Sequence, residues 1–207
     1  MDKAALINKL RRSGLSDSIV NAFSKVKREN FVPEKFASYT YEDVALPTAE
    51  GSSISQPSTV AFMLNLLEPK QGQKILEIGS GTGYVLALMS EIVKDGKIYG
   101  VEIIKDLAIS SKKLLANDSN VQVVHKSGFG GLPEYAPYDR ILVSASSSDI
   151  EIVRKFLPQL KDPGILVAPV KNSIFQIRKE NGKITEKEFQ GFAFVPLVKG
   201  DDDEKAD

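Results

Sequence analysis

A short apolar strand that runs directly into three alternating glycines places the strongest constraint on this chain. The segment 76–78 has the composition of a buried strand, and Gly79, Gly81 and Gly83 follow it at every second position. Glycines let a backbone turn sharply and approach a ligand that a Cβ would block, and the helix that follows offers free N–H groups. A dinucleotide site would need Gly or Ala where this chain has Tyr84.

The charge beside this turn favours a cationic ligand. Glu77 stands two residues before the first glycine, where a carboxylate would repel a pyrophosphate. S-adenosylmethionine carries an α-ammonium and a sulfonium, which a carboxylate attracts. The turn therefore predicts an S-adenosylmethionine site, although a glycine-rich turn alone is equally compatible with a purely structural role.

A second acidic residue agrees with this prediction. The segment 97–102 has the pattern of another short strand, and Glu102 ends it about 20 residues after Gly83. Rossmann-like folds place an acid at that distance, on the ribose hydroxyls of the ligand. Taken by itself, Glu102 fits a solvated charge at a strand end better, but together with the glycine turn we interpret it as a ribose-binding residue.

The composition argues against several classes of protein. Lys and Arg total 27 and so do Asp and Glu, so no net charge draws the chain to nucleic acid or to a membrane surface. With no cysteine and one histidine, disulfides, thiolate chemistry and a metal site are not expected. The chain shows neither a secretory leader nor an apolar run of about 18 residues. We therefore expect a soluble, cytoplasmic protein.

The order of apolar segments predicts an α/β fold. Strand-type runs alternate with helical patterns, which is typical of a mostly parallel, doubly wound, Rossmann-like sheet with helices on both faces. The expected strands are 73–78, 97–102, 121–125, 139–145 and 164–170, and the expected helices between them are 83–94, 105–117 and 149–160. Because the carboxyl ends of parallel strands share one edge, Glu77 and Glu102 are expected to lie together there.

The first part of the chain is expected to form a helical preface. Apolar residues have helical spacing over 3–12 and 16–26, and breaks by Pro, Gly and Ser over 38–55 indicate a loop region with short strands. Pro57 is well placed to begin a helix over 57–68.

The last part of the chain is expected to close the sheet. Segments 172–179 and 185–197, divided by Glu180-Asn181-Gly182, suggest an antiparallel pair. The expected division is an N-terminal helical and loop segment that contributes to the active site (1–56), a main domain (57–199) and a charged, disordered tail (200–207).

Seven segments, taken in order, carry a resemblance to a known family. They are RENFVP (28–33), SISQPSTVAFML (53–64), LEIGSGTGY (76–84), IYGVE (98–102), APYDRILVSA (136–145), LVAPV (166–170) and FVPL (194–197). In order and spacing they resemble the protein-L-isoaspartate O-methyltransferases, over roughly residues 20–198. The glycine turn is common to many methyltransferases, whereas SISQP and FVPL are much more particular to this family.

The resemblance implies a methyltransferase fold and an activity. Such enzymes methylate the free α-carboxylate of L-isoaspartyl residues, which form when Asn deamidates or Asp isomerises in aged proteins. The methyl ester then closes to a succinimide, whose hydrolysis returns part of the damage to normal aspartate. The implied cofactor is S-adenosylmethionine, the implied partners are isoaspartyl proteins and peptides, and we expect a monomer.

The resemblance also implies roles for residues of this chain. Ser55 matches the family's active-site serine, whose hydroxyl would hydrogen-bond the substrate carboxylate, and Gln56 and Val195 are expected to contact the substrate. The expected cofactor-binding residues are Glu77, Gly79, Ser80, Gly81, Gly83, Tyr84, Glu102, Ile103, Ser127 and Gly128.

The chemistry requires few functional groups. A carboxylate with a reference pKa of about 3.9 is already ionised near neutrality, so methyl transfer to it needs no general base. His125 is therefore expected to be an ordinary structural or surface residue, and Asp139 a turn or capping carboxylate at the opposite edge of the sheet. Ser55 also fits a helix N-cap before Pro57, and both roles can hold. The serines from Ser144 to Ser148 are expected to border the crevice as connecting residues.

Several positions depart from the family pattern. Family members usually have Gly-Asp-Gly after the third strand, with the Asp accepting from the adenine amino group, where this chain has Lys126-Ser127-Gly128. Pro163-Gly164 and the serines 146–148 also differ from the usual glycine pair and small residues. Two alternatives stay open: a divergent carboxyl methyltransferase for another protein or small-molecule acceptor, and a non-catalytic S-adenosylmethionine-binding adaptor. A nucleic-acid methyltransferase is not favoured, because the chain has no basic excess to hold phosphates.

Overall fold

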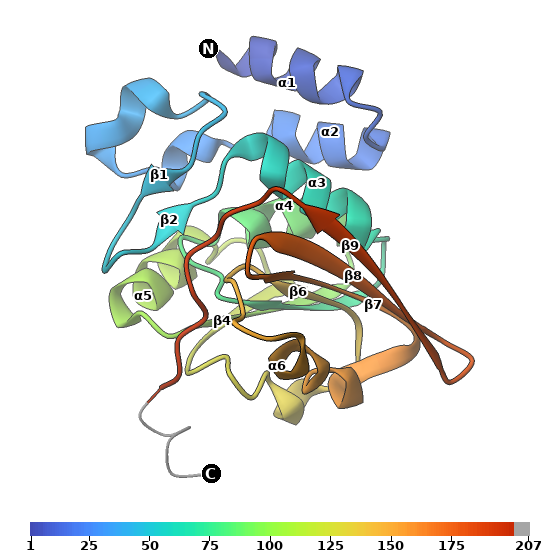
Figure 1. Cartoon of the computed structure of the whole chain (residues 1–207). Coiled ribbons are helices and arrows are strands. Elements are labelled where there is room, and N and C mark those ends of the chain that lie inside the picture. Colours follow the sequence, from blue (N-terminus) through green and yellow to red (C-terminus); the bar gives the residue numbers. More distant parts are fainter. Residues whose placement is uncertain (201–207) are drawn as a thin grey trace.

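A seven-stranded mixed sheet forms the centre of the computed structural model, which describes residues 1–200 (Figure 1). Its strands lie in the order β5-β4-β3-β6-β7-β8-β9. Their bounds are β3 (Lys74–Ile78), β4 (Lys97–Glu102), β5 (Val121–His125), β6 (Tyr138–Val143), β7 (Leu160–Val170), β8 (Ser173–Glu180) and β9 (Lys183–Gln190). The first five strands in this order, from β5 to β7, are parallel to one another, whereas β8 is antiparallel to β7 and β9 is antiparallel to β8. The predicted α/β fold, with a mostly parallel sheet and an antiparallel C-terminal pair, is confirmed.

Helices cover the sheet unequally on its two sides. Figure 1 shows α3 and α4 against one face, with α1 and α2 stacked outside them, while the short α6 lies on the opposite side. Their bounds are α1 (Lys3–Arg12), α2 (Asp17–Lys25), α3 (Pro57–Leu67), α4 (Tyr84–Val93), α5 (Lys105–Leu114) and α6 (Ile150–Arg154), with 3-10 turns at Arg28–Asn30, Glu34–Tyr39, Pro133–Tyr135 and Leu157–Gln159. The helix α5 packs against β4 and β5.

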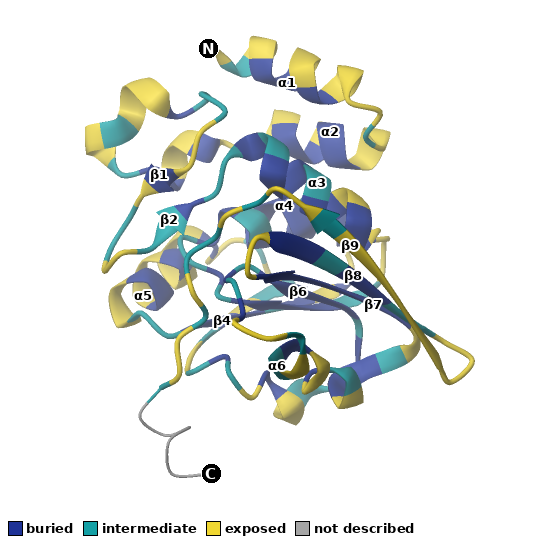
Figure 2. Cartoon of the chain, in the orientation of Figure 1, coloured by how far each residue is buried: buried dark blue, intermediate teal, exposed yellow. Residues whose placement is uncertain are grey.

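Alternate residues of the central strands belong to two different cores. Ile75 and Leu142 pack into the core shared with α3 and α4, whereas Leu76 and Ile141 pack into the core on the side of α6. A strand that buries both faces needs a nearly continuous apolar run, which is the pattern of β3 and β6. Figure 2 shows the contrast with β9, whose residues are almost all exposed.

The N-terminal segment packs onto the main body. Leu6 of α1 and Phe23 of α2 belong to the same core as Ile75 of the sheet. The predicted short strands of the loop region are present, because β1 (Leu46–Pro47) pairs antiparallel with β2 (Ser53–Ile54). The domain boundary at 56/57 stays a prediction.

The helix expected over 149–160 is shorter than predicted. The helix α6 ends at Arg154, and a 3-10 turn that contains Pro158 follows. Proline lacks an N–H, and its ring clashes with the carbonyl four residues earlier, which is that of Arg154. The proline therefore sets the end of α6.

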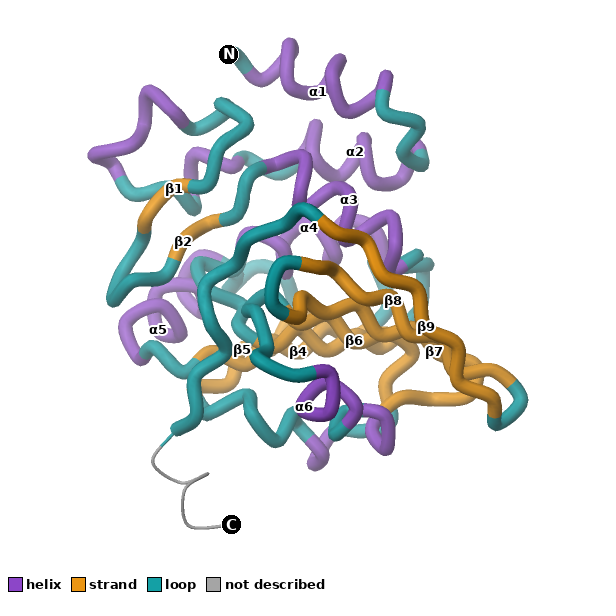
Figure 3. The backbone as a smooth tube through the Cα atoms, in the orientation of Figure 1, coloured by secondary structure: helices purple, strands orange, loops and turns teal. Residues whose placement is uncertain are grey.

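The expected strand over 185–197 is also wrong in its length. The strand β9 ends at Gln190, and Gly191 adopts a positive φ of 96° that turns the chain out of the sheet. Figure 3 shows the loop that leaves β9 and runs back along the molecule. This loop (191–200) brings Pro196 beside Ser146, at the end of β6.

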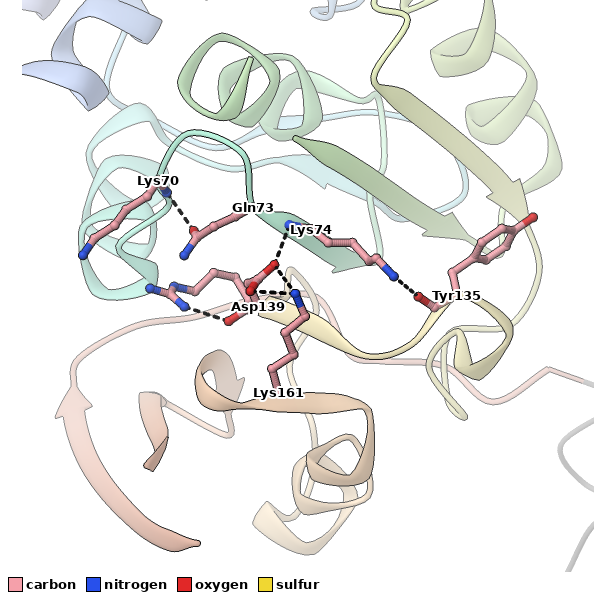
Figure 4. Close-up of polar contacts among 7 residues, drawn as sticks. Lys70, Gln73, Lys74, Tyr135, Asp139 and Lys161 are labelled. Atoms are coloured by element: carbon pink, nitrogen blue, oxygen red, sulfur yellow. Dashed lines mark hydrogen bonds and ion pairs between the residues drawn. The ribbon is translucent and has the colours of Figure 1, made fainter. Parts of the chain in front are cut away.

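The opposite, amino-terminal edge of the sheet is tied together by Asp139. Its carboxylate accepts a hydrogen bond of 2.7 Å from the backbone N–H of Lys74 and bonds of 2.9 and 3.0 Å from Lys161 Nζ (Figure 4). The bonds join the starts of β3, β6 and β7, and they place Asp139 at the edge predicted for it. Within residues 1–200, no helix has the length and apolar character needed to cross a membrane. The predicted disordered tail falls almost entirely on 201–207, outside the described residues.

Candidate functional site

A cavity of about 310 Å³ opens at the carboxyl ends of β3, β4 and β6. Its walls come from the glycine turn, the strand ends, the β1–β2 loop, α3 and the loop after β9. The lining residues are Glu50 to Ser55, Val60, Met63, Glu77 to Thr82, Tyr84, Val85, Val101 to Ile104, Gly128, Leu142, Ser144, Ala145 and Phe194 to Val198. The fold therefore gathers segments that are spread between Glu50 and Val198 around one space.

The glycine turn is held in place by the neighbouring strand. The backbone N–H groups of Gly79 and Ser80 both donate to the carbonyl of Val101, at 2.8 and 3.1 Å. Gly81 has a φ of +54°, and no atom of residues 1–200 beyond its chain neighbours lies within 4 Å of the place where a Cβ would stand. Since Gly81 lines the cavity, this open space is where a ligand can approach the backbone closely.

Glu102 supports the turn as well as lining the cavity. Its side chain is on the face of β4 that Ile98 shares, and it is only 4% exposed. One carboxylate oxygen accepts from the N–H of Gly81 at 2.7 Å and the other from the N–H of Ile104 at 2.8 Å. Sequence reasoning missed these two bonds. Each oxygen keeps a second lone pair, so Glu102 can hold the turn and still accept from a ligand hydroxyl.

Glu77 is the most unusual titratable group in the site. It is 1% exposed; Ser144 Oγ donates to Oε1 at 2.7 Å, while Oε2 has no hydrogen-bond partner among residues 1–200. Burial raises the pKa of Glu77 to about 8; the bond from Ser144 opposes this rise and the charge of Glu102 adds to it. A buried carboxylate oxygen without a donor, in a cavity wall, is suited to a cation that arrives with the ligand.

These features fit S-adenosylmethionine. Its ammonium and sulfonium charges suit the unpaired oxygen of Glu77, its ribose hydroxyls suit Glu102, and the open side of Gly81 accepts a close approach. Within residues 1–200, no group of three or more His, Cys, Asp or Glu side chains is arranged to hold a metal ion.

A second cavity of about 550 Å³ adjoins the first. Five residues line both: Ser53, Ser55, Ser144, Phe194 and Val195. The second cavity is further lined by Gln56, so all three predicted substrate residues lie around it. The carbonyl of Val195 accepts from the N–H of Ser146 at 2.7 Å, which fixes the wall between the two spaces.

The alternative role of Ser55 as a helix cap is wrong. The N-cap residue of α3 is Gln56, which makes no side-chain capping bond, and Asp43 Oδ1 instead accepts from the N–H of Ser58 at 2.8 Å. Because capping needs a side chain at the N-cap position itself, Ser55 lies one residue too early. Its carbonyl accepts a bond of 2.9 Å from Arg28 Nη2.

The predicted cofactor residues do not all reach the cavity. Glu77, Gly79, Ser80, Gly81, Tyr84, Glu102, Ile103 and Gly128 line it, whereas Gly83 and Ser127 do not. A Cβ on Gly83 would lie 2.9 Å from Leu115 Cδ1, so glycine is needed there for packing against the end of α5. Ser127 Oγ accepts from the N–H of Phe129 at 3.3 Å. His125 is exposed, and its Nε2 lies 3.1 Å from the carbonyl of Ile103.

Sequence reasoning left out much of the cavity wall. Of the serines expected to border the crevice, Ser144 lines the cavity and Ser146 to Ser148 do not. The wall residues that were not predicted include Ala145 after β6, and Thr82 and Val85 beside the glycine turn. The FVPL segment was a signal for Phe194 to Leu197, since it carries the family resemblance. Nothing in the periodicity of the chain marks Glu50 or Met63 as wall residues.

Comparison with known proteins agrees with this geometry. The model of the family described as protein-L-isoaspartate(D-aspartate) O-methyltransferase matches residues 1–202. A protein-L-isoaspartate O-methyltransferase of Methanococcoides burtonii is 40% identical over an alignment of 200 residues. The alignment covers 93% of this chain and 98% of that protein.

Solved structures give the same result. A structure titled protein-L-isoaspartate O-methyltransferase has a TM-score of 0.86 at 29% identity over 96% of this chain, which spans 66% of that protein. A second structure is described as a protein-L-isoaspartate O-methyltransferase from Plasmodium falciparum in complex with S-adenosyl-L-homocysteine. Its TM-score is 0.81 at 26% identity, over 97% of this chain and 100% of that protein. The resemblance stated from the sequence is confirmed, and this chain belongs to the protein-L-isoaspartate(D-aspartate) O-methyltransferase family.

Proposed function

We propose that this chain transfers the methyl group of S-adenosylmethionine to the α-carboxylate of L-isoaspartyl residues in damaged proteins. The observation that carries the proposal is the pair of adjoining cavities, which share Ser55 and Val195 in their walls. One cavity has a carboxylate-lined glycine turn suited to the cofactor. The other gives an acceptor access to the same wall.

Residues of the first cavity have distinct tasks. Glu77 Oε2 is the acceptor for a cationic group of the cofactor, Glu102 accepts from the ribose hydroxyls, and Gly81 allows contact with the backbone. When bound, S-adenosylmethionine would supply an electrophilic methyl group, to which a carboxylate oxygen would bond in line as the bond from methyl carbon to sulfur breaks and a neutral thioether leaves. The chain needs no proton acceptor for this step, because the attacking carboxylate is already ionised.

Residues of the shared wall position the acceptor. Ser55 Oγ donates a hydrogen bond to the substrate carboxylate, and the backbone around Val195 lies along the substrate peptide. Phe194 and Val195 line both cavities and exclude water from the space between them. Holding the reacting atoms in near-attack geometry can by itself supply about 7–11 kcal/mol of rate enhancement.

The same positioning gives specificity. An isoaspartyl residue presents a free α-carboxylate on a backbone lengthened by one methylene, whereas a normal aspartyl residue presents its side-chain carboxylate from a different connectivity. A misplacement of about 1 Å can cost on the order of a hundredfold in rate, so a normal aspartyl peptide is a far poorer acceptor. We propose a monomer, because residues of one chain line both cavities.

The test is transfer of labelled methyl to two peptides that differ only in Asp versus isoAsp. The wild type is expected to label the isoaspartyl peptide alone. Ser55→Ala should lower turnover with little change in S-adenosylmethionine affinity, as expected for a group that acts on the acceptor. Ser148→Ala is the matched control, because Ser148 is an exposed serine that lines neither cavity. This variant should leave turnover unchanged.

The outcomes separate the alternatives. Equal transfer to both peptides, or tight cofactor binding with transfer to neither, would overturn the repair function in favour of another acceptor. Binding without transfer to any carboxylate acceptor would favour the adaptor.

A further inference from the structure

Arg28 is a fully buried cation at the junction between the N-terminal segment and the methyltransferase body. Its relative exposure is 0%, and burial lowers its pKa. Nε donates to the carbonyl of Thr40 and Nη2 to the carbonyl of Ser55, both at 2.9 Å. Its third nitrogen, Nη1, has no hydrogen-bond partner within residues 1–200. Burying a guanidinium in this way costs its hydration, which an apolar side chain of the same size would not lose.

The guanidinium also contacts the cofactor side of the molecule. Its Cζ lies 4.8 Å from the centre of the Tyr84 ring, within the range of a cation–π interaction. Tyr84 begins α4 directly after the glycine turn and lines the first cavity. Phe23 and Phe31 pack on the same ring, at centroid distances of 6.1 and 5.6 Å. One planar group therefore contacts both the Ser55 peptide and the start of the cofactor helix.

The energetics speak against a role in stability alone. Desolvating a charge costs several kcal/mol, and replacing buried charges by apolar side chains of similar volume is often neutral or stabilising. The rigid fork of an arginine has a different advantage, since it fixes two acceptors relative to each other and to a stacked ring. The acceptors here are carbonyls from two separate loops, and one belongs to the residue at the wall between the cavities.

We propose that Arg28 is a positioning residue that sets the Ser55 hydroxyl relative to the cofactor cavity, an inference that rests on the proposed function. By holding the Ser55 carbonyl, Arg28 fixes the peptide unit between Ser55 and Gln56, and the stacked Tyr84 ring supplies the reference point on α4. Without this link, the Ser55 hydroxyl is still present but is no longer held in the position where it can donate to the acceptor carboxylate.

Arg140 provides a matched control. It too is buried, at 8% exposure, and it donates to two backbone carbonyls, those of Glu68 at 3.2 Å and Asp139 at 2.8 Å. It lies near the start of β6, at the amino-terminal edge of the sheet, and lines neither cavity. Arg28→Met and Arg140→Met thus remove the same kind of group from the two ends of the fold.

The experiment combines kinetics with a double-mutant cycle. Arg28→Met should lower kcat/KM for the isoaspartyl peptide roughly 10- to 100-fold while the S-adenosylmethionine Kd stays within about threefold; Arg140→Met should change neither. In a Ser55→Ala background, Arg28→Met should cause little further loss, because the group that it positions is gone. Hydrogen exchange of the backbone amides in 53–58, without cofactor, should quicken in Arg28→Met and not in Arg140→Met.

Two outcomes would overturn the inference. Full kcat/KM in folded Arg28→Met would do so, as would an equal and additive loss in the Ser55→Ala background. If Arg28→Met does not fold, Arg28→Lys takes its place in every comparison, because one ammonium group cannot reproduce the fork to both carbonyls. A wild type that labels neither peptide would count against the proposed function, while the exchange measurement still reports on the link between Arg28 and Ser55.

Discussion

Glu77 should make the stability of this protein fall as the pH rises, which is the reverse of the usual behaviour of carboxylates. Burial raises its pKa from an ordinary 4.5 to about 8. Between these two values the folded protein retains a proton that the unfolded chain has released, so stability is lost as the pH increases through this window. Each pKa unit corresponds to about 1.4 kcal/mol, so the loss over the whole window is on the order of 5 kcal/mol.

Glu77→Gln removes the titration and keeps the shape of the side chain. In urea unfolding of the cofactor-free protein, the wild type should lose stability relative to Glu77→Gln as the pH goes from 5 to 8, by an amount on the order of 4 kcal/mol. Ser144→Ala removes the hydrogen bond that favours the ionised form, so it should extend the loss to higher pH. Wild-type and Glu77→Gln curves that stay parallel over this range would show that the carboxyl titrates normally.

The same carboxyl should link cofactor binding to protons. A cation beside Oε2 favours the ionised form, so binding of S-adenosylmethionine at pH 6–7 should release a proton and the affinity should rise with pH. Calorimetry in buffers of different ionisation enthalpy measures the number of protons released on binding. Glu77→Gln is the control, because protons released by the ligand itself appear in both proteins. An identical pH dependence in both proteins would place the ligand's charge away from Glu77.

Other predictions follow from the same geometry. Gly81→Val should abolish S-adenosylmethionine binding in a folded protein, because a β-branched side chain would fill the open face of the turn; unchanged calorimetric binding would place the ligand elsewhere. Gly83→Ala should instead destabilise the fold by about 1–3 kcal/mol in urea unfolding, through the clash with Leu115, with affinity retained in the folded fraction. Glu102→Ala should weaken cofactor binding roughly ten- to a hundredfold and Glu102→Gln less, since Gln keeps one acceptor; wild-type affinity in both would contradict the proposed bonds from the ribose hydroxyls to Glu102. Asp139→Asn should lower stability at neutral pH and leave methyl transfer intact. The bonds from Lys74 and Lys161 lower the pKa of Asp139, so they stabilise the fold above the ordinary pKa of an aspartate, and this stabilisation is lost as the pH falls through the lowered pKa.

The sheet and its carboxyl edge could be predicted from local patterns. The apolar runs that end at Ile78 and at Glu102 have the length of strands buried on both faces, and the glycine turn marks where the first of them stops. The errors in the lengths of α6 and β9 arose where a single residue overrides an apolar pattern. Pro158 stops α6, and Gly191 turns the chain out of the sheet after β9.

The site was only partly predictable, because its hydrogen bonds cross long stretches of sequence. That Glu102 lies beside the turn follows from parallel topology, but its bonds to the N–H groups of Gly81 and Ile104 depend on the conformation of the turn. Gly83 has the spacing of a ligand-binding glycine, yet what requires it is its φ of +86° and the close contact with Leu115, just after α5. Arg28 lies in the RENFVP segment, and no periodicity indicates that its guanidinium reaches a carbonyl 27 residues away.

The two buried carboxylates of the site differ in a way that suits a cofactor with both polar and charged parts. Glu102 is satisfied by two backbone N–H groups before any ligand arrives, so it keeps the turn in one conformation and offers only its spare lone pairs. Glu77 has one oxygen bonded to Ser144 and one without a donor among residues 1–200, so its ionised form lacks a partner until the ligand supplies a cation. Two fully satisfied carboxylates would give a rigid turn with little preference for a cation. Two unsatisfied ones would place repelling charges in one buried space and would both take up protons. The observed division keeps the turn preformed and still leaves a buried carboxyl that ionises when a cationic group of the ligand binds beside it.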